Sequence, residues 1–95
     1  MPYLAQFYFS IHKYYEKALA ICETVLGTEH PDTAITYSNI ASVYKALGDY
    51  DKALEYYNKA FAIFTKTLGS EHEYTVSTLS AIVTIKSELD QGEKQ

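Results

Sequence analysis

The chain has 95 residues, of which 47% are hydrophobic, a formal net charge of -4 and an isoelectric point near 5.2. This length and composition are typical of one globular domain. The acidic balance and the scattered positions of the eight Lys and Arg residues exclude nucleic acid and acidic membrane surfaces as expected partners, because both bind clustered basic side chains. No apolar run approaches the roughly 20 residues of a membrane span, so no membrane association is expected.

Apolar periodicity and the positions of Gly and Pro predict four helices and a polar, frayed tail, at about 3–26, 31–46, 50–68, 73–89 and 90–95. Gly27 and Gly69 each follow a Leu at the end of an apolar stripe, where a helix C-cap favours a left-handed residue. Pro31 suits the first turn of the second helix, and Gly48 marks the boundary after it. Since the connections are short, successive helices should lie antiparallel.

Residues 15–34 recur at 57–76, a displacement of 42 residues. Ten of the twenty aligned positions are identical, including the Leu-Gly pair at each helix end and the Glu-His pair after it. A fixed period of this size is typical of a stacked repeat array, in which each unit buries its apolar face against its neighbours.

The second and third helices carry large and small residues at fixed spacing, namely Tyr37, Ala41, Tyr44, Gly48, Tyr50, Ala53, Tyr57 and Ala60. Through this pattern, residues 34–64 resemble a tetratricopeptide repeat (TPR). The usual proline is absent at Thr65, and the period is 42 residues, which fits a longer second helix. The long period and the LGTEHPDTA linker resemble the kinesin light chain type of this family. The resemblance implies an all-α, right-handed superhelix of antiparallel helix hairpins.

Aligned in this way, the chain is a single TPR-like domain over 1–95. It comprises the second helix of a partial repeat with its linker, a complete repeat and the first helix of another partial repeat, at 1–30, 31–69 and 70–89. The pattern decays in the outer helices, where Ile11 stands for Ala53 and Lys86 for Tyr44. This decay favours the true ends of a short array, with drift inside a fragment of a longer array as the alternative.

The resemblance also implies a function, because TPR proteins bind protein or peptide partners on the concave face that their first helices form. The matching positions here are Ile35, Ser38, Asn39, Ser42, Lys45, Ser77, Ser80 and Thr84, with Ala81 and Ser87 beside them. In this family the Asn of the first helix often bonds a peptide backbone, and Asn39 matches it. Lys45 is the only basic residue of the set, which argues against a ligand held by its carboxylates. A solvated face without a ligand is the alternative.

A structural role is the rival function. Leu4, Phe7, Tyr8, Phe9 and Ile11 cluster near the N-terminus, and the helix that would cover one side of them is missing from the sequence. Uncovered apolar surface of this kind indicates self-association or a partner. The rival prediction is therefore a unit that forms homo-oligomers through its uncovered end helices, the N-terminal one in particular.

Chemistry at single residues is not expected, so the sequence predicts no enzyme, cofactor or metal. His30 and His72 are two helix packings apart, too far to share an ion at about 2 Å, and each fits a polar position at a helix start. His12 and Glu16, one helical turn apart, are expected to form a surface pair. Cys22 aligns with Phe64 and is expected to be a small buried thiol. As the only cysteine it excludes an intramolecular disulfide and favours the cytoplasm.

Overall fold

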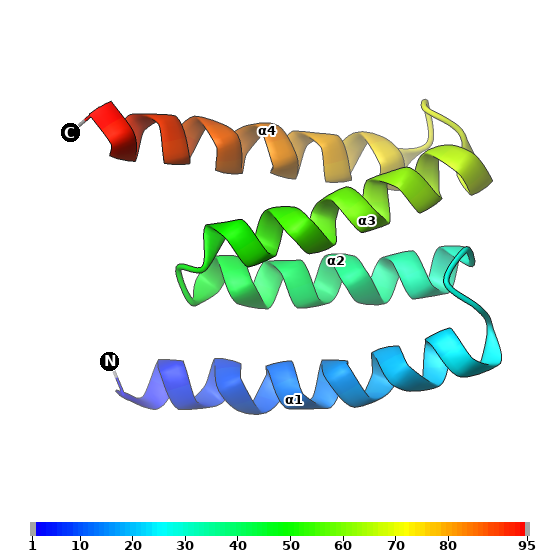
Figure 1. Cartoon of the computed structure of the whole chain (residues 1–95), viewed down its shortest axis with the longest axis horizontal. Helices are drawn as coiled ribbons and strands as arrows, with labels where there is room; N and C mark the ends of the chain where they lie inside the picture. Colours follow the sequence, from blue (N-terminus) through cyan, green and yellow to red (C-terminus); the bar gives the residue numbers. More distant parts are fainter. Residues whose placement is uncertain (1, 95) are drawn as a thin grey trace.

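The computed structural model describes the backbone of residues 2–94 and the side chains of residues 6–91. It contains four helices: α1 (Pro2–Val25), α2 (Pro31–Ala46), α3 (Tyr50–Leu68) and α4 (Glu73–Lys94). Each helix packs against the next one in the chain, and successive helices run in opposite directions (Figure 1). The array measures 40 × 29 × 17 Å. The predicted all-α fold of antiparallel helix hairpins is confirmed.

The helix ends follow the predicted glycine and histidine positions. Gly27 and Gly69 have φ angles of 89° and 93°, in the left-handed region that disfavours any residue with a Cβ atom. The Nδ1 atoms of His30 and His72 each accept a hydrogen bond from the backbone N–H two residues on, at 3.0 and 3.1 Å. The two histidines therefore cap the starts of α2 and α4, as expected of polar residues at these positions.

Helix α4 is longer than predicted. The sequence predicts a helix end at residue 89 and a frayed tail over 90–95, whereas the structure continues the helix to Lys94, and Gln95 lies outside the described residues. No proline follows residue 89, and Gly92 alone costs only about 1 kcal/mol in a helix interior. Nothing in this polar segment therefore forces the helix to end.

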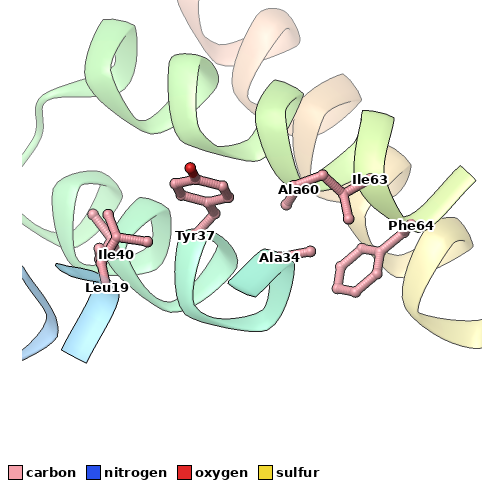
Figure 2. Packing of buried hydrophobic residues seen from close by; sticks show 7 residues of the cluster. All are labelled: Leu19, Ala34, Tyr37, Ile40, Ala60, Ile63 and Phe64. Atoms are coloured by element: carbon pink, nitrogen blue, oxygen red, sulfur yellow. The ribbon is translucent and has the colours of Figure 1, made fainter. Parts of the chain in front are cut away.

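The first part of the core lies where α2 and α3 meet, with one residue from α1. Its members are Leu19, Ala34, Tyr37, Ile40, Ala60, Ile63 and Phe64. Figure 2 shows the Phe64 ring and the Ala34 side chain pointing toward one another from α3 and α2. The small residues Ala34 and Ala60 are fully buried, so they let the two helices approach while the aromatic rings fill the space beside them.

A second cluster joins α3 to α4 and comprises Ala41, Ala53, Tyr57, Ile82 and Ile85. Ala41 of α2 and Ala53 of α3 are fully buried, so small residues stand where these two helices meet. Ile82 and Ile85 form the inward stripe of α4. Helix α3 thus has two buried faces, one against α2 and one against α4.

Polar contacts join α1 to α2. The Tyr37 hydroxyl donates to Glu23 Oε2 at 2.7 Å, and His12 Nε2 lies 2.6 Å from the Tyr44 hydroxyl. His12 also lies 3.2 Å from Glu16, but its side chain is only 14% exposed. The predicted His12–Glu16 pair is therefore present and Glu16 is exposed, but the imidazole is more buried than expected because the Tyr44 ring of the next helix covers it.

Cys22 differs from its predicted buried state. Its side chain is half-buried, with Sγ 3.6 Å from Thr36 Oγ1. The equivalent Phe64 is buried because α4 covers it together with α2, whereas the main packing partner of α1 is α2 alone. A position on the same stripe is therefore less covered in the outer helix.

Tyr37 gives the α1–α2 contact a dependence on pH. Burial, followed by the hydrogen bond to Glu23, raises the pKa of Tyr37 from 10.0 to about 12. The unfolded chain therefore loses this proton at lower pH than the folded chain, so stability falls as the pH rises from about 10 toward 12. Between pH 8 and pH 11, we expect the free energy of unfolding of the wild type to fall by about 1.4 kcal/mol more than that of Tyr37→Phe.

Denaturant unfolding of both proteins at the two pH values measures this effect. The two proteins differ only at position 37, so the comparison isolates the contribution of the Tyr37 hydroxyl. An unchanged difference between wild type and Tyr37→Phe would show that Tyr37 ionises equally in the folded and unfolded chains.

Candidate functional site

A cavity of about 220 Å³ lies where α2, α3 and α4 meet. Its lining residues are Ile35, Ser38, Asn39, Phe64, Tyr74, Ser77 and Thr78. Helices α2 and α4 contribute the walls, and α3 contributes the Phe64 ring. The structure therefore brings together Ile35, Ser38, Asn39 and Ser77 of the predicted peptide-binding set.

The polar groups at the cavity differ in what they already bind. Thr78 Oγ1 donates to the Tyr74 carbonyl at 2.7 Å, so its proton is used within α4. Ser38 Oγ is buried and has no hydrogen-bond partner among the described residues. Buried hydroxyls are normally paired, so an unpaired one beside a cavity is a candidate contact for a ligand. Asn39 is exposed and offers an amide that both donates and accepts.

The apolar part of the cavity comes from two aromatic rings. Phe64 is fully buried, and its ring centre lies 5.6 Å from that of Tyr74, which is partly exposed at the rim. The centre of the His72 ring lies 5.0 Å from that of Tyr74. With Ile35, these rings make an apolar surface next to the free polar groups.

Phe64, Tyr74 and Thr78 line the cavity but are absent from the predicted site. Phe64 belongs to the core and lines the cavity as well. Tyr74 aligns with Asp32 by the 42-residue shift, so the internal repeat does not predict an aromatic residue at this position. An unmatched aromatic residue in the first turn of a first helix was the available signal.

The remaining predicted residues lie outside the cavity. Ser42 Oγ lies 2.8 Å from the Tyr57 hydroxyl and 3.1 Å from the Ser38 carbonyl, so its hydrogen bonds are made within the hairpin. Lys45 is half-buried near the end of α2, and Ser80 and Thr84 are exposed on α4. Their role in binding a peptide stays a prediction.

The cavity lining contains no Asp, Glu, His, Lys or Arg, since its seven residues are Ile, Ser, Asn, Phe, Tyr and Thr. Such a lining suits neutral groups, because a buried charge without a partner is costly. Within residues 6–91, no three His, Cys, Asp or Glu side chains gather as metal ligands would. Across residues 2–94, no helix has both the length and the apolar character needed to cross a membrane.

Comparison with known proteins gives relatives for parts of the chain. A stretch of 41 residues, 43% of this chain, is 46% identical to Protein KINESIN LIGHT CHAIN-RELATED 2 of Arabidopsis thaliana, and covers 6% of that protein. A stretch of 39 residues, 41% of this chain, is 44% identical to the mitochondrial tetratricopeptide repeat protein 19 of Rattus norvegicus, and covers 11% of it. The chain therefore spans a small part of the length of these relatives.

The family model described as "Tetratricopeptide repeat" matches residues 4–66 and again residues 32–93. The two matches overlap on α2 and α3, the hairpin that forms the main core, and together they reach every helix of the structure. Repeats of this kind generally mediate protein–protein interaction on a non-catalytic fold. On the strength of these matches and of its helix-hairpin architecture, the chain belongs to the tetratricopeptide repeat family.

Proposed function

We propose that the chain is a non-catalytic interaction module that binds an extended peptide segment of a protein partner along α2 and α4. The observation that supports this function is the cavity between these helices, which combines an unpaired buried hydroxyl, an exposed amide and an apolar floor. Predicted residues Ile35, Ser38, Asn39 and Ser77 contribute to it. Lys45, Ser42, Ser80 and Thr84 would extend the peptide path along the same two helices.

The size and chemistry of the cavity define the kind of peptide. Its volume of about 220 Å³ is below the roughly 300 Å³ at which small-molecule sites begin, so it suits one side chain. Ile35, Phe64 and Tyr74 favour an apolar side chain there. The Asn39 amide can hold a backbone peptide group on both its N–H and its C=O. We therefore propose a neutral, extended segment with one apolar anchor.

Asn39→Ala should weaken peptide binding about 5- to 10-fold, as expected for the loss of about 1 to 1.4 kcal/mol of hydrogen bonding. The ligand is a fluorescent peptide selected from a displayed random library on the wild-type chain, and its affinity is measured by fluorescence anisotropy. Asn58→Ala is the matched control, because Asn58 is also exposed but lies on α3, away from the cavity.

Two results would contradict this function. One is a library that yields no binder of the wild-type chain. The other is a selected peptide that binds Asn39→Ala and Asn58→Ala equally well, since the hydrogen bond to Asn39 would then play no part. Thermal unfolding of each variant checks that the exposed substitutions leave the fold intact.

We also propose a second function, self-association through α1, which is supported by its exposed apolar side chains. Phe7, Tyr14, Ile21 and Val25 are all exposed although they are large and apolar. Tyr8 and Ile11 of the predicted N-terminal cluster are half-buried, and the side chain of Leu4 lies outside the described residues. An uncovered stripe of this kind on a helix favours contact with another chain.

The cytoplasm is the proposed location of the chain. The single half-buried cysteine, Cys22, suits a reducing compartment. Imaging of a fluorescent fusion of the full-length protein tests this proposal, and accumulation inside an organelle would contradict it.

A further inference from the structure

The internal repeat shows what normally covers the exposed stripe of α1. In α3, the face that packs against α2 consists of Ala53, Tyr56, Ala60 and Ile63, and the 42-residue shift places Ile11, Tyr14, Ala18 and Ile21 at the same positions of α1. Three of these four residues are identical in the two helices. Ile63 is 6% exposed, whereas Tyr14 and Ile21 are 70% and 63% exposed. Helix α1 therefore presents the residues of a hairpin face that none of the described helices covers.

Helix α4 presents the opposite half of the same contact. In α2, the face toward α3 consists of Ala34, Tyr37, Ala41 and Tyr44, and the shift places Val76, Leu79, Val83 and Lys86 at the same positions of α4. Leu79 and Val83 are 45% and 58% exposed, and Val76 is exposed as well. The inward stripe of α4, with Ile82 and Ile85, is already packed against α3. The exposed stripe is thus a second apolar face of the helix.

We propose that α4 of one copy packs against α1 of a second copy in the register of α2 on α3, so that a complete helix hairpin forms across two chains. This inference rests on the second proposed function and assigns its two surfaces. Each copy carries both halves of the contact, because its α1 matches α3 and its α4 matches α2. The occupant of both exposed stripes is then another copy of the same chain.

The register assigns specific neighbours. In the α2–α3 hairpin, Tyr56 lies between Tyr37 and Tyr44, with ring centres 5.9 and 5.7 Å away. At the contact between copies, Tyr14 takes the place of Tyr56, and Leu79 and Lys86 take the places of the two flanking tyrosines. An ammonium group beside a tyrosine ring is an attractive pair, so Lys86 can replace a ring stacked on Tyr14.

The tightest point of the contact changes in size. Ala41 and Ala53, both fully buried, become Val83 and Ile11. At the four equivalent positions, the two alanines and two tyrosines of α2 are replaced in α4 by side chains of intermediate size. The total volume and the apolar pattern are kept, but the volume is distributed differently among the four positions. Cores tolerate such redistribution with some loss of fit. We therefore expect the helices to lie farther apart in this contact than in the α2–α3 hairpin.

Pairing of α4 with α1 also continues the candidate binding surface. In this arrangement, α2 of the second copy would lie beside α4 of the first copy in the same way that α4 lies beside α2 within one copy. The equivalents of Ile35, Ser38 and Asn39 on α4 are Ser77, Ser80 and Ala81, and they would face Ile35 of the second copy. The second copy therefore contributes residues to a surface that a single copy leaves incomplete.

A contact between two different faces does not close on itself, so copies should add head to tail. The wild-type chain should show a mass that rises steadily with concentration in sedimentation experiments. An α1–α1 or α4–α4 contact would instead stop at a dimer.

Two variants, each blocked at one end, test the pairing. One is Tyr14→Glu with Ile21→Glu on α1, and the other is Leu79→Glu with Val83→Glu on α4. All four positions are exposed, so folding should be kept and is checked by helix content from circular dichroism. Asn58→Glu with Thr65→Glu adds the same charge to the exposed side of α3 and is the matched control. If a Glu variant loses helix content, Tyr14→Ser and Leu79→Ser replace the two variants.

Each blocked variant alone should be a monomer up to about 1 mM, and an equimolar mixture of the two should form a 1:1 dimer and nothing larger. The control should assemble like the wild type. A blocked variant that still associates alone, or a mixture that stays monomeric, would overturn the α4–α1 pairing while leaving self-association itself intact. If the wild-type chain is monomeric at the same concentration, both the α4–α1 pairing and self-association are overturned. The two exposed stripes would then bind helices of another kind. Peptide binding at the cavity is measured separately and does not depend on either outcome.

Discussion

Phe64→Ala should lower the free energy of unfolding by about 3 to 5 kcal/mol, the range for removing a fully buried aromatic ring. Phe64 is 2% exposed and is the largest fully buried side chain of the described residues. Its ring contacts the α2 side of the core at Ala34 and lines the cavity beside α4. The deletion would therefore loosen both neighbours of α3. Since a domain of this size has a total stability of roughly 5 to 15 kcal/mol, this loss is at least about a fifth of the total.

Denaturant unfolding followed by circular dichroism measures this loss, with two matched controls. Phe64→Leu keeps most of the volume and should lose less than half as much. Phe9→Ala removes the same ring from an exposed position on α1 and should change the stability by about 0.5 kcal/mol or less. A loss below about 1.5 kcal/mol in Phe64→Ala would show that the core closes around the vacancy.

Phe64 also connects stability to the proposed binding function. The same ring that fills the α2–α3 core forms part of the cavity lining, next to Tyr74. A folded Phe64→Leu variant should therefore bind the selected peptide more weakly than its small change in stability would suggest. The cavity is shaped by the core, which explains why a functional position was hidden among packing positions in the sequence.

The helices were predictable because their boundaries depend on local chemistry. A left-handed Gly needs no neighbour to end a helix, and Pro31 needs none to begin one. The predicted starts and ends of α1, α2 and α3 consequently lie within one residue of those observed. The end of α4 has no such residue, and there the prediction stopped five residues short.

The candidate site was predictable only in part, because it depends on contacts between helices. Ile35, Ser38, Asn39 and Ser77 followed from the resemblance, which specifies a helix face by its register. Tyr74 lines the cavity only because α4 starts beside α2, and periodicity within one helix does not report that distance. The burial of His12 was not predicted for the same reason, since the Tyr44 ring that covers it comes from the next helix.

The close approach of α2 and α3 depends on two alanines, and this gives the second large expected effect. Ala41 and Ala53 are fully buried in one cluster, and close-packed protein interiors seldom admit a longer side chain without movement. Ala53→Leu should therefore lower the free energy of unfolding by about 1 to 3 kcal/mol, because three extra carbons must force the helices apart or leave their preferred rotamers.

Ala62→Leu is the matched control, because it adds the same atoms to the same helix at an exposed position. Leucine and alanine are both good helix formers, so the control should change the stability by less than about 0.5 kcal/mol. Chemical denaturation of the two variants gives the comparison directly. Equal stability in Ala53→Leu and Ala62→Leu would mean that the hairpin tolerates a wider separation. In that case the Val83–Ile11 contact proposed between copies would carry no penalty for its larger side chains, and the two kinds of hairpin should be similar in strength.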